Sequence, residues 1–337
     1  MWTLHSRRRF LAGISLAGAA GLVGLSKPLH AEPPPETVSV RLPVFYKISD
    51  CQIPEYEAGE LLRAEGFTDV RLVDSGTGLD SADWLAKGEL DFDWNYPTTY
   101  ARSIEAGAQI TVLAGLHVGC LELFARDGIN SIADLKGKRV GIFAQTSAPH
   151  VLVILLASYV GLDPFRDIEW VENEKTSPKD LFVDGKIDAF LAQPPEPQEL
   201  RARKIGHAIL KTAADKPWSQ YFCCMLAGAT DYVSKYPVAT KRVLRALLKS
   251  VDLCVSAPEQ AVRRAVDDGY SDSYEYALQA MTDARYDKWR EYDSEDTLRF
   301  YALRMEEAGL LKSDPQKIIA NGTDWRFINE LKRELRT

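Results

Sequence analysis

The sequence predicts an α/β fold in which most strands run parallel. Short apolar runs over residues 38–45, 69–73 and 90–94 alternate with helical stretches over residues 54–65 and 81–87. This alternation is typical of strands joined by crossover helices, because parallel neighbours cannot be connected by a tight turn.

The remaining elements follow from local start and stop signals. Ser131 can cap a short helix that Gly137 ends, and a strand over residues 139–143 follows. Pro149 lies at the start of an apolar helix over residues 151–160, where a proline is tolerated. Two further strands and a helical C-terminal region complete the prediction, with strands over 111–116 and 223–227 and helices over 239–256, 258–267, 294–308 and 325–335.

Chain length and a faint internal repeat predict two similar lobes. About 300 residues follow residue 31, and single hydrophobic cores stop growing at about 250–300 residues. Gly-Glu-Leu-Asp-Phe at residues 88–92 recurs as Gly-Lys-Ile-Asp-Ala at residues 185–189, although chance or a common βα pattern also explains so short a match. We expect one lobe, with the C-terminal helices, from residues 37–125 and about 223–337, and a second lobe from residues 126–222.

The N-terminus has the pattern of an export signal. Ser-Arg-Arg-Arg-Phe-Leu at residues 6–11 precedes a Gly- and Ala-rich apolar stretch, and Ala31 offers a small residue for cleavage. The arginine pair indicates the twin-arginine route. The apolar stretch has about 15 residues, fewer than the ~20 that span a membrane. We therefore predict a twin-arginine signal peptide over residues 1–31 and a periplasmic protein, with a plain secretory leader or an uncleaved anchor as alternatives.

The charge of the chain argues against nucleic acid and against a membrane surface as partners. The formal net charge is −7, and no basic block follows the leader. Nucleic-acid binding needs a concentrated Lys/Arg face. The five cysteines are too few, too widely spaced and odd in number for a disulfide framework, although one bridge could form in an oxidising compartment. Cys223 and Cys224 lie in an apolar run and are expected to be buried strand thiols.

Loops after the predicted strands carry the candidate binding residues. In open α/β sheets, ligands bind beyond the carboxyl ends of the strands. These loops are rich in hydroxyl, amide, aromatic and imidazole side chains, and they contain no known catalytic or phosphate-binding motif. We therefore expect a small-molecule site with no catalytic residue, metal or cofactor, lined by Tyr46, Ser49, Cys51, Ser75, Asn95, Tyr96, Thr98, His117, Cys120, Thr146, Ser147, His150, Gln193, Glu196, Trp218 and Tyr221.

Two features of these loops have more than one interpretation. Thr146 and Ser147 could bind an anion at a helix start, but an ordinary helix cap explains them as well. His117 and Cys120, with Cys51 and His150 in other loops, could gather a soft metal ion. Packing or pocket lining is the simpler explanation for these four residues.

Five segments resemble a known family. They lie at residues 88–92, 107–114, 132–141, 147–150 and 185–189, and the likeness covers roughly residues 38–260. The chain resembles the periplasmic solute-binding proteins of nitrate, sulfonate and taurine importers, which are grouped with the pyrimidine-precursor proteins of thiamine biosynthesis. The resemblance implies a periplasmic-binding-protein clamshell, with a ligand held between two lobes and delivered by a monomer to an inner-membrane ABC permease.

The loop residues depart from the pattern expected for a small anion. They offer Lys47 and two histidines but no clear arginine, whereas Tyr46, Tyr96, Trp218 and Tyr221 suggest stacking on a flat ring. A heteroaromatic ligand therefore competes with a sulfonate or a nitrate-like anion. Binding or synthesis of a thiamine pyrimidine precursor, and a sensor that reports the ligand to a receptor, are the alternative functions.

Overall fold

The computed structural model describes residues 32–44, 49–74 and 81–335. The predicted signal peptide over residues 1–31 lies outside these ranges, as do Tyr46, Lys47 and Ser75. Within the described ranges, no helix combines the length and the apolar character needed to cross a bilayer.

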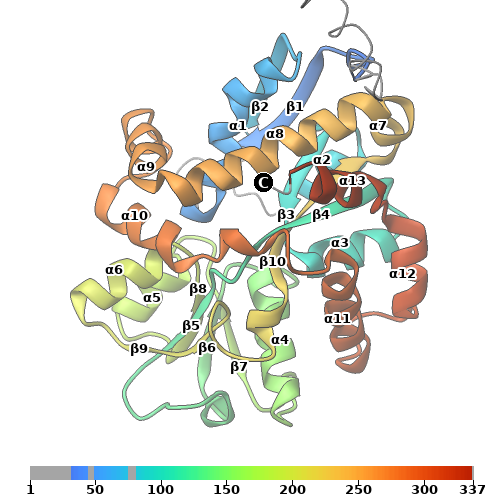
Figure 1. Cartoon of the computed structure of the whole chain (residues 1–337). Coiled ribbons are helices and arrows are strands. Elements are labelled where there is room, and N and C mark those ends of the chain that lie inside the picture. Colours follow the sequence, from blue (N-terminus) through green and yellow to red (C-terminus); the bar gives the residue numbers. More distant parts are fainter. Residues whose placement is uncertain (1–31, 45–48, 75–80, 336–337) are drawn as a thin grey trace, which may run out of the picture. The chain divides into compact units, whose positions relative to one another are not determined.

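The strands form three sheets, one of them a single parallel pair (Figure 1). That pair is β1 (Ser39–Val44) and β2 (Asp69–Asp74). A three-stranded sheet has the order β3 (Phe92–Asn95), β10 (Phe222–Ala229) and β4 (Ile110–Val118). The largest sheet has five strands in the order β7 (Glu169–Glu172), β6 (Arg139–Ile142), β8 (Ala189–Ala192), β5 (Glu122–Ala125) and β9 (His207–Lys211).

The sheets are mixed, but they are less parallel than the sequence predicts. Among the described strands, three pairs run parallel and four run antiparallel. The difference arises at the two central strands, because β10 is antiparallel to both of its neighbours and so is β5. β5 and β10 each come directly after a segment in which the chain crosses from one sheet to the other. A sequence pattern of alternating strands and helices does not show where the chain changes sheets.

Two short segments connect the three-stranded sheet to the five-stranded sheet. The chain leaves the first at the end of β4, through residues 119–121, and returns from β9 to β10 through residues 212–221. β5 lies in the five-stranded sheet, so the first passage comes just before residue 125, where we expect the first lobe to end. The segments touch: the Thr212 hydroxyl donates to the Leu121 carbonyl oxygen over 2.9 Å and accepts from the Leu121 amide over 3.1 Å.

The helices begin where their sequences favour a start. Eight of the described helices have proline in the first turn, which suits a position whose N–H has no helical partner. The helices are α1 (Ile53–Ala64), α2 (Ser81–Ala86), α3 (Pro97–Glu105), α4 (Ala148–Tyr159), α5 (Pro178–Val183), α6 (Glu196–Arg203), α7 (Thr230–Lys235), α8 (Pro237–Ser256), α9 (Pro258–Asp267), α10 (Tyr274–Asp283), α11 (Ser294–Glu307), α12 (Pro315–Gly322) and α13 (Arg326–Glu334). Four short 3-10 turns join them, η1 (Asp50–Gln52), η2 (Ile132–Leu135), η3 (Trp218–Gln220) and η4 (Tyr286–Lys288).

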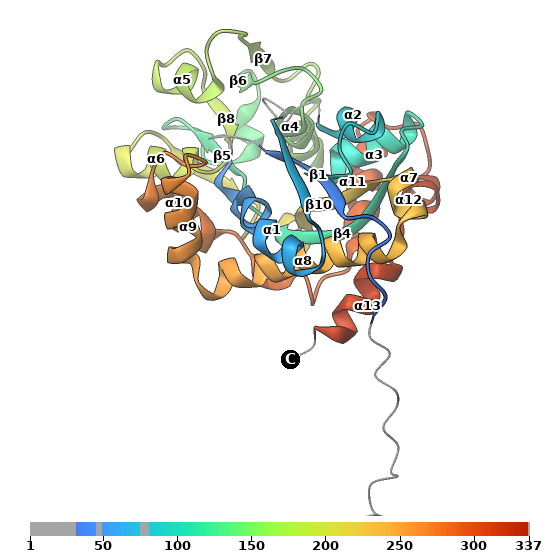
Figure 2. The same cartoon turned by 90° about the horizontal axis from the view of Figure 1, so that it is seen from above.

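Helices from the C-terminal third pack against elements from the start of the chain. α8 lies along α1, and α11 packs against α3 (Figures 1 and 2). α4 is buried along most of its length beside the five-stranded sheet, consistent with its apolar sequence. These contacts confirm the α/β class with a helical C-terminal region.

The internal repeat has the same structural role in both copies. The Asp91 carboxylate accepts hydrogen bonds from the backbone N–H of Arg41 over 2.7 Å and from its guanidinium over 2.6 and 3.2 Å. The Asp188 carboxylate accepts the corresponding bonds from Arg139 over 2.9, 2.7 and 3.1 Å. Each pair ties the start of one strand to the start of a neighbouring one, so the short sequence match reflects a repeated structural unit.

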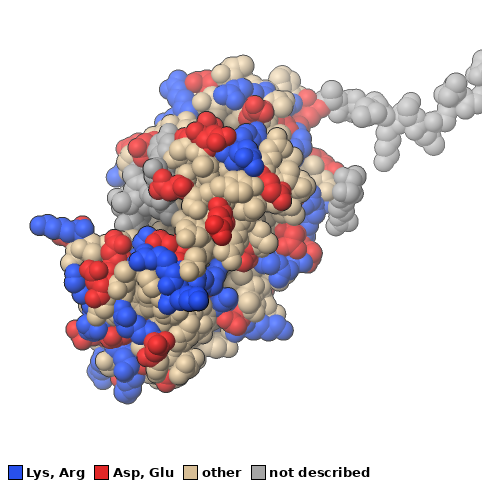
Figure 3. Space-filling view, turned by 90° about the vertical axis from the view of Figure 1, so that its left-hand side faces the viewer, with Lys and Arg blue, Asp and Glu red and all other residues tan. Residues whose placement is uncertain are grey.

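Positive and negative side chains are interspersed on the face that Figure 3 draws. Figure 1 places α6 and α10 on this side, and Arg201 of α6 connects elements here. The Arg201 guanidinium bridges Glu122 of β5 and Asp283 of α10, with 2.7 Å between its Nη2 and the Asp283 carboxylate. Gln198 Nε2 donates to the same Asp283 carboxylate over 3.0 Å. α6 is therefore held to the helical C-terminal region by polar contacts.

Candidate functional site

A pocket of about 500 Å³ lies between loops of the three-stranded and five-stranded sheets. Its walls come from η1, from the end of β3 and the start of α3, and from the loops that follow β6, β7 and β8. It is lined by Ser49, Cys51, Gln52, Trp94, Asn95, Tyr96, Thr99, Phe143, Ala148, Pro149, Asn173, Glu174, Lys175, Thr176, Ser177, Pro178, Gln193, Glu196 and Cys224. The carboxyl ends of strands therefore form the site, as the rule for open α/β sheets predicts.

The end of β3 is fixed by hydrogen bonds on its own side of the pocket. The Asn95 side chain donates from Nδ2 to the Ser81 hydroxyl over 2.9 Å and accepts from the Tyr96 backbone N–H over 2.8 Å. The Tyr100 hydroxyl donates to the carbonyl oxygen of Asp93 over 2.8 Å. These bonds hold the start of α3 against β3 and fix the Asn95 side chain and the Tyr96 backbone at the pocket wall.

The indole N–H of Trp94 is a hydrogen-bond donor at the pocket that the sequence did not predict. Its side chain is almost wholly buried, yet it lines the pocket, and its indole N–H has no hydrogen-bond partner among the described residues. Buried polar groups are nearly always paired. A ligand acceptor in the pocket would satisfy this one.

Glu196 is an acid at the first turn of α6, beside the pocket. Its Oε2 accepts a hydrogen bond from the Gln193 backbone N–H over 3.0 Å. Burial raises the pKa of Glu196 to about 7, although this hydrogen bond and the charge of Lys179 act in the opposite direction. The carboxyl group can therefore either donate or accept a proton near neutral pH.

The Glu196→Gln variant is expected to lose a pH dependence of stability. Because the pKa of Glu196 is raised from 4.5 to about 7, the folded chain keeps a proton that the unfolded chain releases. The free energy of unfolding should fall as the pH rises between these values, and then level off. Urea unfolding between about pH 4.5 and pH 8 should give a shallower slope in the variant than in the wild type, and the slope that remains comes from other buried acids such as Asp50 and Asp93, whose pKa values burial also raises.

Glu199→Gln is the matched control, because Glu199 lies on the same helix but pairs with Lys179 over 2.7 Å. Its pKa is lowered, since burial is outweighed by hydrogen bonds from Lys179 and Arg203. In Glu199→Gln, the free energy of unfolding should still fall with pH above 4.5, as in the wild type. An equal slope in the wild type and Glu196→Gln would contradict the assignment.

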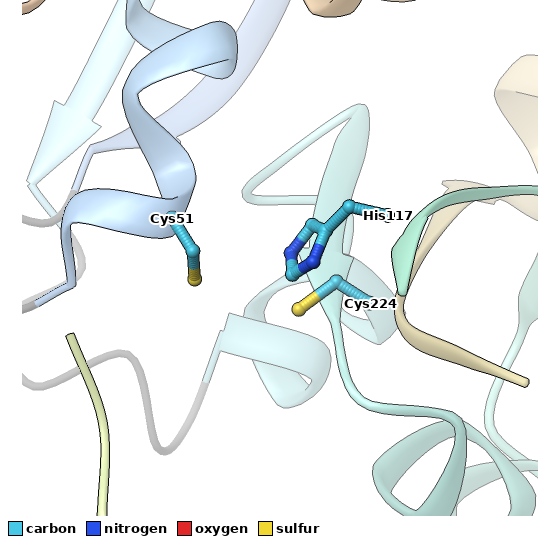
Figure 4. A group of neighbouring side chains, drawn as sticks. All are labelled: Cys51, His117 and Cys224. Atoms are coloured by element: carbon cyan, nitrogen blue, oxygen red, sulfur yellow. The ribbon is translucent and has the colours of Figure 1, made fainter. Parts of the chain in front are cut away.

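Two cysteines and a histidine meet at the inner wall of the pocket (Figure 4). The ligand atoms of Cys51 from η1, His117 from β4 and Cys224 from β10 all lie within 4.8 Å of one another. Burial alone would lower the pKa of His117, but the sulfur atoms of Cys224 and Cys51 raise it to about 10. All five cysteines are buried and free, as expected for Cys223 and Cys224.

The structure brings seven of the sixteen predicted site residues to this pocket or to its inner wall. The pocket itself is lined by Ser49, Cys51, Asn95, Tyr96, Gln193 and Glu196, and His117 lies behind Cys51 and Cys224. Thr98, Thr146 and Ser147 instead line a neighbouring groove of about 990 Å³ between α3 and α4. Tyr46 and Ser75 lie outside the described residues.

Four predicted residues have structural contacts away from the pocket. His150 Nδ1 accepts from the Thr146 N–H over 3.0 Å, and Cys120 Sγ lies 3.3 Å from Cys223 Sγ. Trp218 is buried against aromatic rings of α11, and Tyr221 stacks on Phe300 with 3.8 Å between ring centroids. The start of β10 lies beside the carboxyl ends of β3 and β4, but Phe300 of α11 packs against the rings of Trp218 and Tyr221, and neither residue lines the pocket.

Six of the thirteen lining residues absent from the predicted set come from one segment. Residues 173–178 follow β7, a short strand whose sequence Glu-Trp-Val-Glu has little apolar character. β7 lies at the edge of its sheet, and edge strands need fewer apolar residues than central ones. The signal that could have located the loop is Ser177-Pro178, since Ser177 caps α5 and accepts from the Asp180 N–H.

Solved structures share this architecture at low sequence identity. The periplasmic nitrate-binding protein NrtA of Synechocystis PCC 6803 aligns with a TM-score of 0.77 and 15% identity, over 90% of each chain. The alkanesulfonate-binding protein SsuA of Xanthomonas axonopodis pv. citri aligns with a TM-score of 0.69 and 16% identity, over 88% of this chain and 99% of that one. The fold is thus that of the periplasmic binding proteins.

The sequence itself assigns the family. Residues 63–261 match the family model described as NMT1/THI5 like, and the chain belongs to this family. A Brucella abortus (strain 2308) protein named "Putative binding protein" is 26% identical over 180 residues, which are 53% of this chain and 55% of that protein. A Brucella suis relative with the same description gives the same values. The chain spans about half the length of the curated relatives it matches.

Proposed function

We propose that this protein is a periplasmic solute-binding protein that captures a small molecule between two lobes and delivers it to an ABC permease. The observation that carries the proposal is the pocket itself, which is formed by loops from two different sheets. A pocket of about 500 Å³ falls within the usual range for small-molecule sites, about 300–1,000 Å³. The family and the fold support the same role.

The lobes we propose follow the two passages between the sheets. One comprises the described residues before about 120 and after about 221, and the other comprises the residues between them. Polar contacts across the two parts include the Asp50 N–H to the Pro194 carbonyl oxygen, over 3.3 Å, and Arg201 to Asp283. Such contacts would close the clamshell over a ligand, and the protein would act as a monomer without turnover.

The lining of the pocket favours a flat, polar, uncharged or amine-bearing ligand over a small anion. Among the described lining residues, Lys175 is the one cationic side chain, whereas Glu174 and Glu196 are acidic. Trp94, Tyr96 and Phe143 offer aromatic surface on which a ring can stack. A heteroaromatic compound, such as a pyrimidine precursor, matches these groups better than a sulfonate or nitrate does.

A thermal-shift screen of the mature chain tests the proposal. A ligand at 100 times its Kd should add ~2.7 kcal/mol to the free energy of unfolding. The panel should include pyrimidines and other heteroaromatic amines, together with sulfonates and nitrate. Phe143→Ala should raise the Kd of a hit about tenfold, equivalent to ~1.4 kcal/mol, because a stacking ring is lost.

Phe165→Ala is the control, since Phe165 is 62% exposed and does not line the pocket. It should leave the Kd unchanged. If no compound raises the melting temperature, or if the protein converts a compound to product, the proposed function is wrong. Tightest binding to nitrate or a sulfonate would overturn the ligand class but not the solute-binding role.

A further inference from the structure

The cluster of Cys51, His117 and Cys224 brings together three side chains that are distant in sequence (Figure 4). All three are buried, with exposed fractions of 2%, 0% and 3%. Both thiols are free, and their sulfur atoms and the imidazole nitrogen lie within 4.8 Å of one another. In a tetrahedral zinc site, sulfur ligands are ~3.8 Å apart, so small side-chain rotations would bring these atoms to ligand spacing.

The histidine is oriented as a ligand. Its Nδ1 lies 3.3 Å from the carbonyl oxygen of Gly119. Because a carbonyl oxygen only accepts, Nδ1 carries a proton, and Nε2 is the nitrogen that can offer its lone pair to a metal ion once any proton on it is displaced. Nε2 is buried and has no hydrogen-bond partner among the described residues. A hydrogen bond that fixes the ring through one nitrogen, while the other stays available, is the usual support of a metal-bound histidine.

The ligand types select a class of metal ion. Two thiolates and one imidazole suit Zn²⁺ or Cu⁺, whereas Mg²⁺ and Ca²⁺ prefer oxygen ligands. Two thiolates would also balance the charge of Zn²⁺ inside a buried site. Cys51 and Cys224 line the pocket while His117 lies behind them, so a fourth coordination position would face the cavity.

We propose that Cys51, His117 and Cys224 form a binding site for one thiophilic cation, Zn²⁺ or Cu⁺, with its open coordination position toward the pocket. This set differs from the four residues that the sequence indicates as an alternative. The fold retains Cys51 and His117, replaces Cys120 and His150 with Cys224, and pairs Cys120 with Cys223 instead. The site stands whether or not the pocket binds an organic solute.

Metal titration of the reduced, chelator-treated mature chain tests the proposal. Zn²⁺ alone, in competition with a chromogenic chelator, should bind with a stoichiometry of one, and Cu⁺ should do so under anaerobic conditions. Co²⁺ in place of Zn²⁺ should give thiolate charge-transfer absorption. Cys51→Ser, His117→Gln and Cys224→Ser should each raise the apparent Kd at least ~100-fold, because each removes a ligand.

Cys254→Ser is the matched control, since Cys254 is a buried thiol of α8 outside the cluster. It should bind metal like the wild type. Cys51 lies on a short turn, so Cys51→Ser should fold even if the variants on β4 and β10 do not, and its melting curve without metal checks this. Failure of the reduced wild type to bind, binding that survives Cys51→Ser, or a preference for Fe²⁺ over Zn²⁺ and Cu⁺ would each overturn the proposal.

Discussion

The Gly119→Ala variant is expected to lower the free energy of unfolding by about 3–5 kcal/mol. Gly119 has a φ of +58°, which costs an alanine about 1 kcal/mol. A Cβ at this position would lie 2.2 Å from Ala213 Cα and 2.3 Å from Ala213 N. Both are backbone atoms, so they cannot move aside by a side-chain rotation.

The expected cost is large because Gly119 lies where the two connecting segments pass each other. It belongs to the first passage between the sheets and Ala213 belongs to the second. Hydrogen bonds between Leu121 and Thr212 hold the segments together next to this contact. An added methyl group must therefore push the two connecting segments apart. It should also displace the Gly119 carbonyl oxygen that His117 contacts.

Gly128→Ala is the matched control, because it should show the cost of placing alanine at a positive φ without a steric clash. Gly128 has a φ of +88°, and a Cβ there would meet no atom within 4 Å. Its cost should be about 1 kcal/mol. Urea unfolding of the two variants and the wild type gives the comparison. If Gly119→Ala is no less stable than Gly128→Ala, the two passages are not in the tight contact described.

The Asp91→Ala variant is expected to cost about 2–3 kcal/mol of folding free energy. It leaves the Arg41 backbone N–H and guanidinium without the carboxylate that accepts from them at 2.6–3.2 Å. The Asp91 side chain is only 9% exposed, so water cannot fully replace these bonds. The equivalent Asp188→Ala variant should lose less stability, because the Asp188 side chain is 22% exposed.

Asp69→Ala is a control for the mere loss of an Arg–Asp pair. Asp69 pairs with Arg71 over 2.7 Å, but the two side chains are 40% and 63% exposed. Exposed pairs of this kind contribute little, so its unfolding midpoint should hardly change. The effects of Asp91→Ala and Asp188→Ala should add in the double variant, because they share no partner. A larger effect for Asp69→Ala than for Asp91→Ala would contradict this assignment.

Much of the fold could be predicted because its signals are local. The start of α4 at Pro149, the cap at Ser131 and the positive-φ Gly88 and Gly185 that precede β3 and β8 are all set by neighbouring residues. The repeat around Asp91 and Asp188 was visible for the same reason. The ends of β3 and β8 and the loops after them contain Asn95, Tyr96, Gln193 and Glu196, which could therefore be predicted as lining residues from the sequence.

The rest of the site depends on contacts between distant residues. Cys224 reaches Cys51 and His117 because β10 returns between β3 and β4, more than 100 residues after them. Trp218 and Tyr221 lie on the connection before β10, and α11 covers them instead of a ligand. Residues 173–178 enter the pocket through an edge strand without a clear apolar pattern.

The sequence by itself determined the α/β class, the family resemblance, the repeated Arg–Asp unit and about half of the candidate site, since periodicity, caps and strand-end loops are encoded by adjacent residues. Only the tertiary structure decided the antiparallel central strands, the contact between the two passages and the Cys51–His117–Cys224 cluster. These features arise when strands from remote parts of the chain pair, and strand order is set by the packing of the whole core.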